Sequence, residues 1–286
     1  MEEILILDAC SIINLMRIDT DEEFLGNWIR KTNPYIAETV IKEVNANYKK
    51  NSFEDEHNRE QVEIRIKYLN QFMVNDKDVE SYDGNVMMDE LKKFSKHKKK
   101  ANGELYSTAL CLKTSQEYKK STLFVTDDYP AKDEFAEYFT FHQIGYIVDT
   151  IDLLLLIYHH NEENVFSKNQ LIEFISKLKY RYGEDIEEII KMTQALQNMA
   201  SRQNNKKDKL LALKLENIIE CIDKQPEEGL KELAEYLNNI GTRDAKKIIH
   251  KLENIKQRPP QIFQKLKHIE FALKNYKIYK QDIKYH

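Results

Sequence analysis

Four acidic residues stand in apolar or small-residue contexts that a merely solvated charge would not need. They are Asp8 in "LILDACSIINLM", Glu43 in "AETVIKEV", Glu104 in "NGELYSTALCL" and Asp127 in "LFVTDD". Carboxylates gathered in one place repel each other and are costly to desolvate unless a cation joins them. Oxygen ligands without histidine or cysteine favour Mg²⁺ or Mn²⁺ over zinc. Such an ion engages phosphate oxygens and activates water, so the pattern predicts phosphoester hydrolysis.

Each acid also has a simpler interpretation. Glu43, at the border of an apolar helix face, could be a solvated charge, and Glu104 a first-turn acid favoured by the helix dipole. Asp8 and Asp127 could cap the helices that follow them. Their joint occurrence favours a shared site, because four independent explanations would otherwise have to hold in one small domain. Of the adjacent pair, we expect Asp127 to point into the site and Asp128 to turn outward or support it.

The elements that must position these acids are strands alternating with helices. The aliphatic runs 4–7 and 122–125 read as buried strands, and "GYIVDT" as another. This alternation predicts an α/β fold with a mainly parallel central sheet flanked by helices. Asp8 and Asp127 then lie beyond the carboxyl ends of strands, where such sheets place their sites. Helices are expected over 22–31, 37–49, 56–73, about 85–97, 104–118 and 151–160, with an amphipathic segment at 132–139.

The character of the chain changes after Asn161, where strands stop and helical periods recur between breaks. We therefore predict two domains, an α/β domain over 1–163 that carries the acids and an all-α domain over 164–286 with five or six helices. The second domain is expected to contact a partner or the substrate, or to regulate the first.

Composition limits the class of protein. The 286 residues are 41% hydrophobic and 32% charged, with a net charge of -4, which indicates a soluble, globular, helix-rich chain. Three widely spaced cysteines without a CxxC pair favour a reducing cytoplasm over disulfides or structural zinc. The longest apolar run, 151–158, is too short to span a bilayer, and the start is acidic where a signal peptide is basic. We expect a cytoplasmic protein without membrane association.

In their order along residues 4–158, the motifs resemble those of the PIN-domain nucleases. "LILDACSIINL" is similar to the family's strand-end aspartate followed three residues later by Ser or Thr, here Asp8 and Ser11. "AETVIKEV", "NGELYSTALCL" and "LFVTDD" resemble the later motifs. Many relatives have aspartate where Glu104 stands, and the helical tail has no counterpart in the small relatives.

The resemblance implies a PIN-like fold and a divalent-metal-dependent endonuclease, usually acting on RNA. It implies that Mg²⁺ or Mn²⁺ is held by Asp8, Glu43, Glu104 and Asp127. Ser11 and Thr126 would orient carboxylates, with Asp128 as a further supporting group. Small bacterial members are toxins held by an antitoxin, and larger ones serve RNA processing or antiviral defence, so an inhibitory or activating protein partner is expected. Homo-oligomerisation is left open.

Two alternatives stay open. The first is a magnesium-dependent phosphatase of the haloacid dehalogenase type, although Asp8 is followed by Ala9 and Cys10 rather than by the "DxD" of that class. The second is a nuclease-like scaffold that binds RNA or a protein without cutting. A binding module has little reason to keep mutually repelling carboxylates.

A lysine run precedes Glu104 and would offset the repulsion between phosphate and the acids. Its members are Lys92, Lys93, Lys96, Lys98, Lys99 and Lys100. We expect them to bind nucleic acid, although a lysine run is often only solvated surface. The basic C-terminal stretch could add a second such surface or be an outer helix face.

Overall fold

The computed structural model describes residues 3–19, 25–50, 56–95, 102–159, 167–203, 205–253 and 259–275. These residues divide into two compact units, the first reaching Phe174 and the second beginning at Ile175. The predicted boundary between residues 163 and 164 lies outside the described residues. In the described part of the chain, none of the helices combines the length and apolar character needed to cross a membrane.

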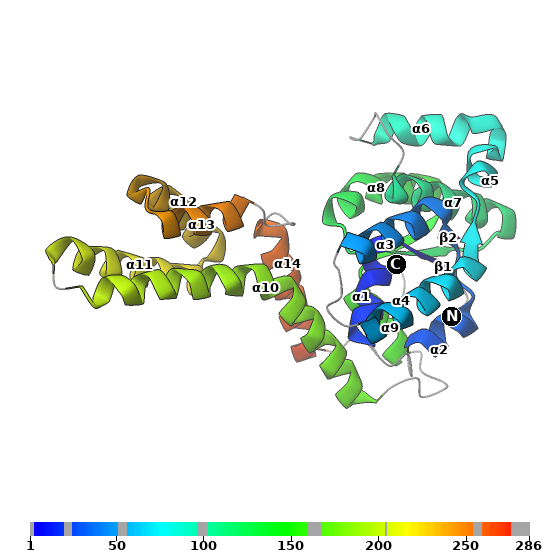
Figure 1. The fold of residues 1–286 in the computed structure, drawn as a ribbon. Helices are drawn as coiled ribbons and strands as arrows, with labels where there is room; N and C mark the ends of the chain where they lie inside the picture. Colours follow the sequence, from blue (N-terminus) through cyan, green and yellow to red (C-terminus); the bar gives the residue numbers. More distant parts are fainter. Residues whose placement is uncertain are drawn as a thin grey trace. The chain divides into compact units, whose positions relative to one another are not determined.

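A small parallel sheet forms the centre of the first unit (Figure 1). Its strands are β1 (Ile4–Leu7), β4 (Thr122–Val125) and β5 (Gly145–Val148), in the order β1-β4-β5. The register pairs Leu7 with Val125 and Val125 with Val148. The predicted parallel sheet flanked by helices is therefore present, and its strands end level with one another.

A second parallel pair, β2 (Ile36–Ala37) and β3 (Met73–Val74), lies beside this sheet, because Tyr35 forms a parallel bridge with Ile6. The helix expected over 56–73 is thereby shortened. Helix α4 (Glu56–Leu69) is followed by a 3-10 turn, η1 (Asn70–Phe72), and then by β3. Pairing of Met73 with Ile36 is a long-range contact, which overrides the local helical pattern.

The other helices of the first unit connect and cover these strands. Their bounds are α1 (Ala9–Ile18), α2 (Leu25–Thr32), α3 (Glu38–Lys50), α5 (Asp76–Glu80), α6 (Val86–Phe94), α7 (Gly103–Tyr118), α8 (Tyr129–His142) and α9 (Thr150–His159). Helix α6 ends before residue 97, the predicted end, and α5 was not expected. Helix α7 packs against β1 and β4 with buried small residues such as Ala109 and Cys111. This close packing brings the first turn of α7 toward the sheet.

The second unit is helical throughout the residues described for it. Helix α10 (Lys168–Ser201) reaches into it and is followed by α11 (Lys206–Lys224), α12 (Pro226–Ile240), α13 (Arg243–Glu253) and α14 (Pro259–Asn275). Buried aliphatic residues at helical spacing, such as Leu215, Ile218 and Ile222 of α11, form its core with Leu233 and Leu237 of α12. The prediction of an all-α C-terminal part is confirmed at this level.

Candidate functional site

The carboxyl ends of the sheet strands bring distant acids into one place. The Asp8 backbone N–H donates to the Val125 carbonyl over 3.1 Å, and the Thr126 N–H donates to the Val148 carbonyl over 2.9 Å. The residue after β1 and the turn after β4 are thus held side by side. The positions after β1 and β4, at which the sequence predicts the site, are therefore adjacent.

Asp8 is only 3% exposed and is held by side chains rather than used as a helix cap. Its Oδ2 accepts hydrogen bonds from Thr126 Oγ1 (2.9 Å) and Cys10 Sγ (3.0 Å). Although Asp8 occupies the N-cap position of α1, its side chain makes no capping hydrogen bond. Burial, and secondarily the charge of Asp128, raises the pKa of Asp8 despite these donors. The capping explanation of this residue therefore fails.

Glu104 lies in the first turn of α7 and faces the other acids. Burial raises its pKa to about 9, with further contributions from a hydrogen bond to Asp128 and from the charges of Asp128 and Asp8. Asn102 Nδ2 donates to Glu104 Oε2 over 3.2 Å, and this hydrogen bond lowers the pKa of Glu104. Asp8, Glu104 and Asp128, here called the acidic cluster, are therefore electrostatic neighbours.

Asp127 and Asp128 have neighbours different from those expected. The Asp127 carboxylate, 3% exposed, accepts hydrogen bonds from Asn14 Nδ2 and from the hydroxyl and backbone N–H of Thr150. Asp128 is the residue that contacts Glu104. Asp128, which was expected to turn outward or support the site, thus contacts Glu104, and the Asp127 carboxylate is held by Asn14 and Thr150. Neither Asn14 nor Thr150 was among the predicted site residues.

Glu43 reaches the same region from α3. Its Oε1 accepts a hydrogen bond of 2.9 Å from the backbone N–H of Gly103, the first residue of α7. A Cβ on Gly103 would lie 2.5 Å from Glu43 Oε2. Glu43 therefore rests on the N-terminus of the helix that carries Glu104, where a carboxylate is favoured by the free N–H groups and the helix dipole.

The two hydroxyl residues of the motifs behave differently. Thr126 contacts the Asp8 carboxylate directly, as a group that orients it would. Ser11 instead donates to two backbone carbonyls, those of Asp8 (2.8 Å) and Val125 (2.9 Å). Ser11 thus joins the ends of β1 and β4 rather than contacting a carboxylate through its side chain.

Cys10 is a neighbour of the acidic cluster that was not among the predicted site residues. Its thiol donates to Asp8, and its sulfur accepts a hydrogen bond of 3.1 Å from the Asp127 N–H. Burial, and then the charges of Asp8 and Asp127, raises the pKa of the Cys10 thiol well above its ordinary value. The thiol is therefore neutral and serves Asp8 as a donor.

Only part of the lysine run can be located. Lys92 and Lys93 are exposed in the last turn of α6, and Lys92 Nζ lies 3.9 Å from Asp89 Oδ1. Lys96, Lys98, Lys99 and Lys100 lie outside the described residues. The predicted nucleic-acid-binding role of all six stays a prediction.

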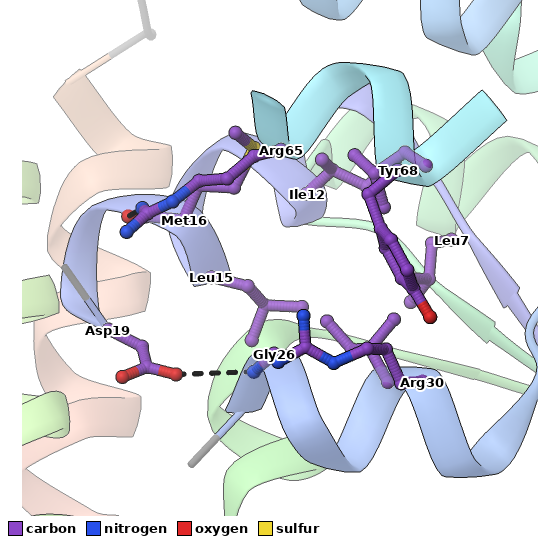
Figure 2. A pocket seen from close by; sticks show the side chains of 11 residues that line it. Leu7, Ile12, Leu15, Met16, Asp19, Gly26, Arg30, Arg65 and Tyr68 are labelled. Carbon is purple, nitrogen blue, oxygen red and sulfur yellow. Dashed lines mark hydrogen bonds between the residues drawn. The ribbon is translucent and has the colours of Figure 1, made fainter. Parts of the chain in front are cut away.

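A pocket beside α1 is lined by none of the residues of the acidic cluster. It lies between α1, α2 and α4, with a volume of about 40 Å³ (Figure 2). Arg65 Nη1 donates to the Met16 carbonyl (3.1 Å), and Asp19 Oδ2 accepts from the Gly26 N–H (3.2 Å). Since a cavity that holds benzene measures roughly 150 Å³, the enclosed space is too small for a nucleotide base. These polar contacts tie helix ends together.

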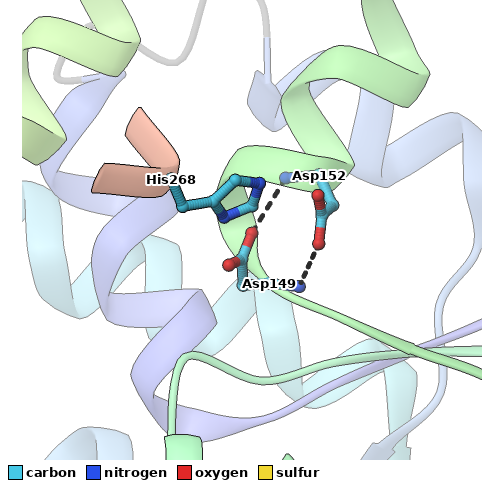
Figure 3. A group of neighbouring side chains, drawn as sticks. All are labelled: Asp149, Asp152 and His268. Carbon is cyan, nitrogen blue, oxygen red and sulfur yellow. Dashed lines mark hydrogen bonds between the residues drawn. The ribbon is translucent and has the colours of Figure 1, made fainter. Parts of the chain in front are cut away.

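Beyond β5, Asp149 and Asp152 form a reciprocal pair at the start of α9 (Figure 3). The Asp149 N–H donates to Asp152 Oδ2 (3.3 Å), and the Asp152 N–H donates to Asp149 Oδ1 (2.9 Å). This arrangement satisfies two backbone donors at the helix start, as in a capping box. It sets the orientation of α9, whose first residue, Thr150, contacts Asp127.

The donor set of the acidic cluster fits a hard divalent cation. All its potential ligand atoms are carboxylate oxygens, the type that Mg²⁺ and Mn²⁺ prefer. The oxygens of Asp8, Glu104 and Asp128, all in the described part of the chain, do not all lie within 4.8 Å of one another. A shared cation would draw these oxygens closer together.

Comparison with protein-family models, curated proteins and solved structures gives no match to this chain. The resemblance to PIN-domain nucleases therefore stands on the motifs alone.

Proposed function

We propose that this protein is a divalent-metal-dependent endoribonuclease whose site is the acidic cluster with Glu43 beside it. The observation that supports this best is the position of Glu104 against Asp128 and Asp8, at the carboxyl ends of β1 and β4. Buried acids with raised pKa values in such a place are typical of functional sites.

Asp8, Glu104 and Asp128 are the residues proposed to hold Mg²⁺ or Mn²⁺. The bound ion would supply Lewis-acid activation of water and charge stabilisation at the phosphate. Thr126 and Cys10 orient the Asp8 carboxylate through their hydrogen bonds. Glu43 accepts a hydrogen bond from the Gly103 N–H at the start of α7, the helix that carries Glu104, and we propose it as a further ligand of the ion.

RNA is the proposed substrate, because the PIN-domain nucleases, which this chain resembles in its motifs, usually cut RNA. A cluster of carboxylates repels phosphate, so the substrate needs cationic contacts. The exposed Lys92 and Lys93 are the described candidates for that role. Because an uncontrolled nuclease would be harmful, we also propose control by a protein partner, as expected for toxin, antiviral-defence or RNA-processing nucleases.

The decisive experiment compares three substrates. Labelled structured RNA, single-stranded DNA and a phosphomonoester are incubated with Mg²⁺, Mn²⁺ or EDTA. Asp8→Asn and Asp128→Asn are tested beside Asp133→Asn, a matched change at an exposed position of α8. We expect metal-dependent internal cleavage of RNA that both cluster variants lose and the control keeps.

The other outcomes favour the alternatives. RNA binding without cleavage under every metal condition would support the scaffold function. Hydrolysis of the phosphomonoester alone would support the phosphatase.

A further inference from the structure

We infer that Asp127 is a positioning residue, whose buried carboxylate ties α1 and α9 to the turn after β4 and thereby directs Asp128 toward Glu104. The expected effect of Asp127 on metal binding rests on the proposed function. The arrangement itself follows from hydrogen bonds of the described residues.

The first step is burial. Asp127 and Asn14 are each 3% exposed, and Thr150 is fully buried. A carboxylate at such a depth is retained only where donors surround it. Asn14 Nδ2 approaches Oδ2, and the Thr150 hydroxyl approaches the same oxygen while its N–H reaches Oδ1 at 3.3 Å.

The second step is connectivity. Asn14 belongs to the helix that follows β1, and Thr150 opens the helix that follows β5. Asp127 lies in the turn that follows β4, between them. One carboxylate therefore joins the segments that leave all three strands of the sheet at its carboxyl edge.

The third step is direction. The backbone at Asp128 is extended (φ -81°, ψ 110°), and its carboxyl contacts Glu104 while the adjacent Asp127 carboxylate contacts Asn14 and Thr150. Anchoring Asp127 toward Asn14 and Thr150 therefore leaves Asp128 on the side of Glu104. The Asp128 N–H also donates to Thr126 Oγ1 over 3.1 Å, which holds the turn to the hydroxyl that contacts Asp8.

The test removes one hydrogen-bond donor to Asp127 while keeping the shape of the Thr150 side chain. Thr150→Val deletes the hydroxyl, and Thr150→Ser restores it. Thr140→Val, at an exposed threonine of α8, is the matched control. Mn²⁺ alone is titrated into each full-length variant and followed by electron paramagnetic resonance. Removing a group that hydrogen-bonds behind the metal ligands typically weakens metal affinity roughly 10- to 100-fold. We therefore expect Thr150→Val to bind Mn²⁺ about tenfold more weakly than wild type. Thr150→Ser should bind it with near wild-type affinity.

A crystal structure of metal-free Thr150→Val separates this inference from the proposed function. We expect Asp128 to have left Glu104 while the sheet is unchanged. An Asp128 carboxyl that still contacts Glu104 would overturn the inference, as would wild-type Mn²⁺ affinity in the folded Thr150→Val protein. Failure of the wild-type protein to bind Mn²⁺ would instead refute the proposed metal site, and the crystal structure would still decide the positioning role.

Discussion

The Thr126 hydroxyl donates a 2.9 Å hydrogen bond to the Asp8 carboxylate across 118 residues of sequence. Both residues directly follow paired positions of parallel strands, Leu7 of β1 and Val125 of β4. The contact is therefore a direct product of strand register, and it holds a buried acid in place at the carboxyl edge of the sheet.

Thr126→Val tests this contact. The valine keeps the shape of threonine but leaves the buried Asp8 with one donor fewer, so the free energy of unfolding should fall by about 1–3 kcal/mol. Urea denaturation measures the change. Thr140→Val, at an exposed position, should stay within about 0.5 kcal/mol of wild type. Equal effects in the two variants would show that the hydroxyl of Thr126 has no special role.

Gly103→Ala tests the support that Glu43 gives to α7. Alanine in place of glycine inside a helix normally stabilises by about 1 kcal/mol. At Gly103 the added Cβ would meet Glu43 Oε2 at 2.5 Å and Val40 Cγ2 at 3.2 Å, so Glu43 must move and the gain should be absent.

Gly183→Ala is the matched control, because among the described residues no atom lies within 4 Å of a Cβ at that helical position. Thermal or urea unfolding should show stabilisation for Gly183→Ala and none for Gly103→Ala. In the double variant with Glu43→Ala, part of the missing gain should return. Equal stabilisation by both single alanines would contradict the close approach of Glu43.

The pH dependence of stability should reveal Glu104. Its pKa of about 9 in the folded, metal-free protein exceeds the ordinary value of 4.5. Between these values the folded state keeps a proton that the unfolded state has released, so this contribution is complete below about pH 4.5 and is lost as pH rises toward about 9.

Urea denaturation in EDTA from pH 5 to 8 measures this slope. Glu104→Gln should flatten the fall in stability with pH relative to wild type, whereas the exposed Glu63→Gln should leave it unchanged. Because Asp8 also has a raised pKa, some slope of the same sign should remain in Glu104→Gln. A slope identical in Glu104→Gln and wild type would mean that the Glu104 carboxyl is ionised in the folded protein.

Metal binding should stabilise the protein and relieve the repulsion of the acidic cluster. Free Mn²⁺ at 100 times its Kd should add about 2.7 kcal/mol to the free energy of unfolding, and EDTA should reverse the effect. Asp128→Asn should abolish this gain while making the metal-free protein no less stable, because it removes one of the repelling charges. Scanning calorimetry with and without Mn²⁺ measures both effects, and stabilisation by Mn²⁺ that persists in Asp128→Asn would place the ion elsewhere.

Several features follow from local sequence alone. The aliphatic runs of β1 and β4 predict buried parallel strands, and the acids directly after them fall at the carboxyl edge whatever the details of packing. The helical second unit likewise follows from its periodic apolar residues. These features depend on the order and spacing of residues, which can be read from the sequence without knowledge of tertiary contacts.

The roles of adjacent acids depended on tertiary structure. Asp127 and Asp128 are identical in type and neighbours in sequence, and the positions of Asn14 on α1 and Thr150 on α9 distinguish their side chains. Similarly, the sequence placed Glu43 at a helix border, but its contact with Gly103 arises from the packing of α3 on α7. The sequence by itself determined which acids reach the edge of the sheet. Which of them enter the cluster was decided by buried hydrogen bonds between segments far apart in the chain, because a buried carboxylate turns toward the donors that the fold provides.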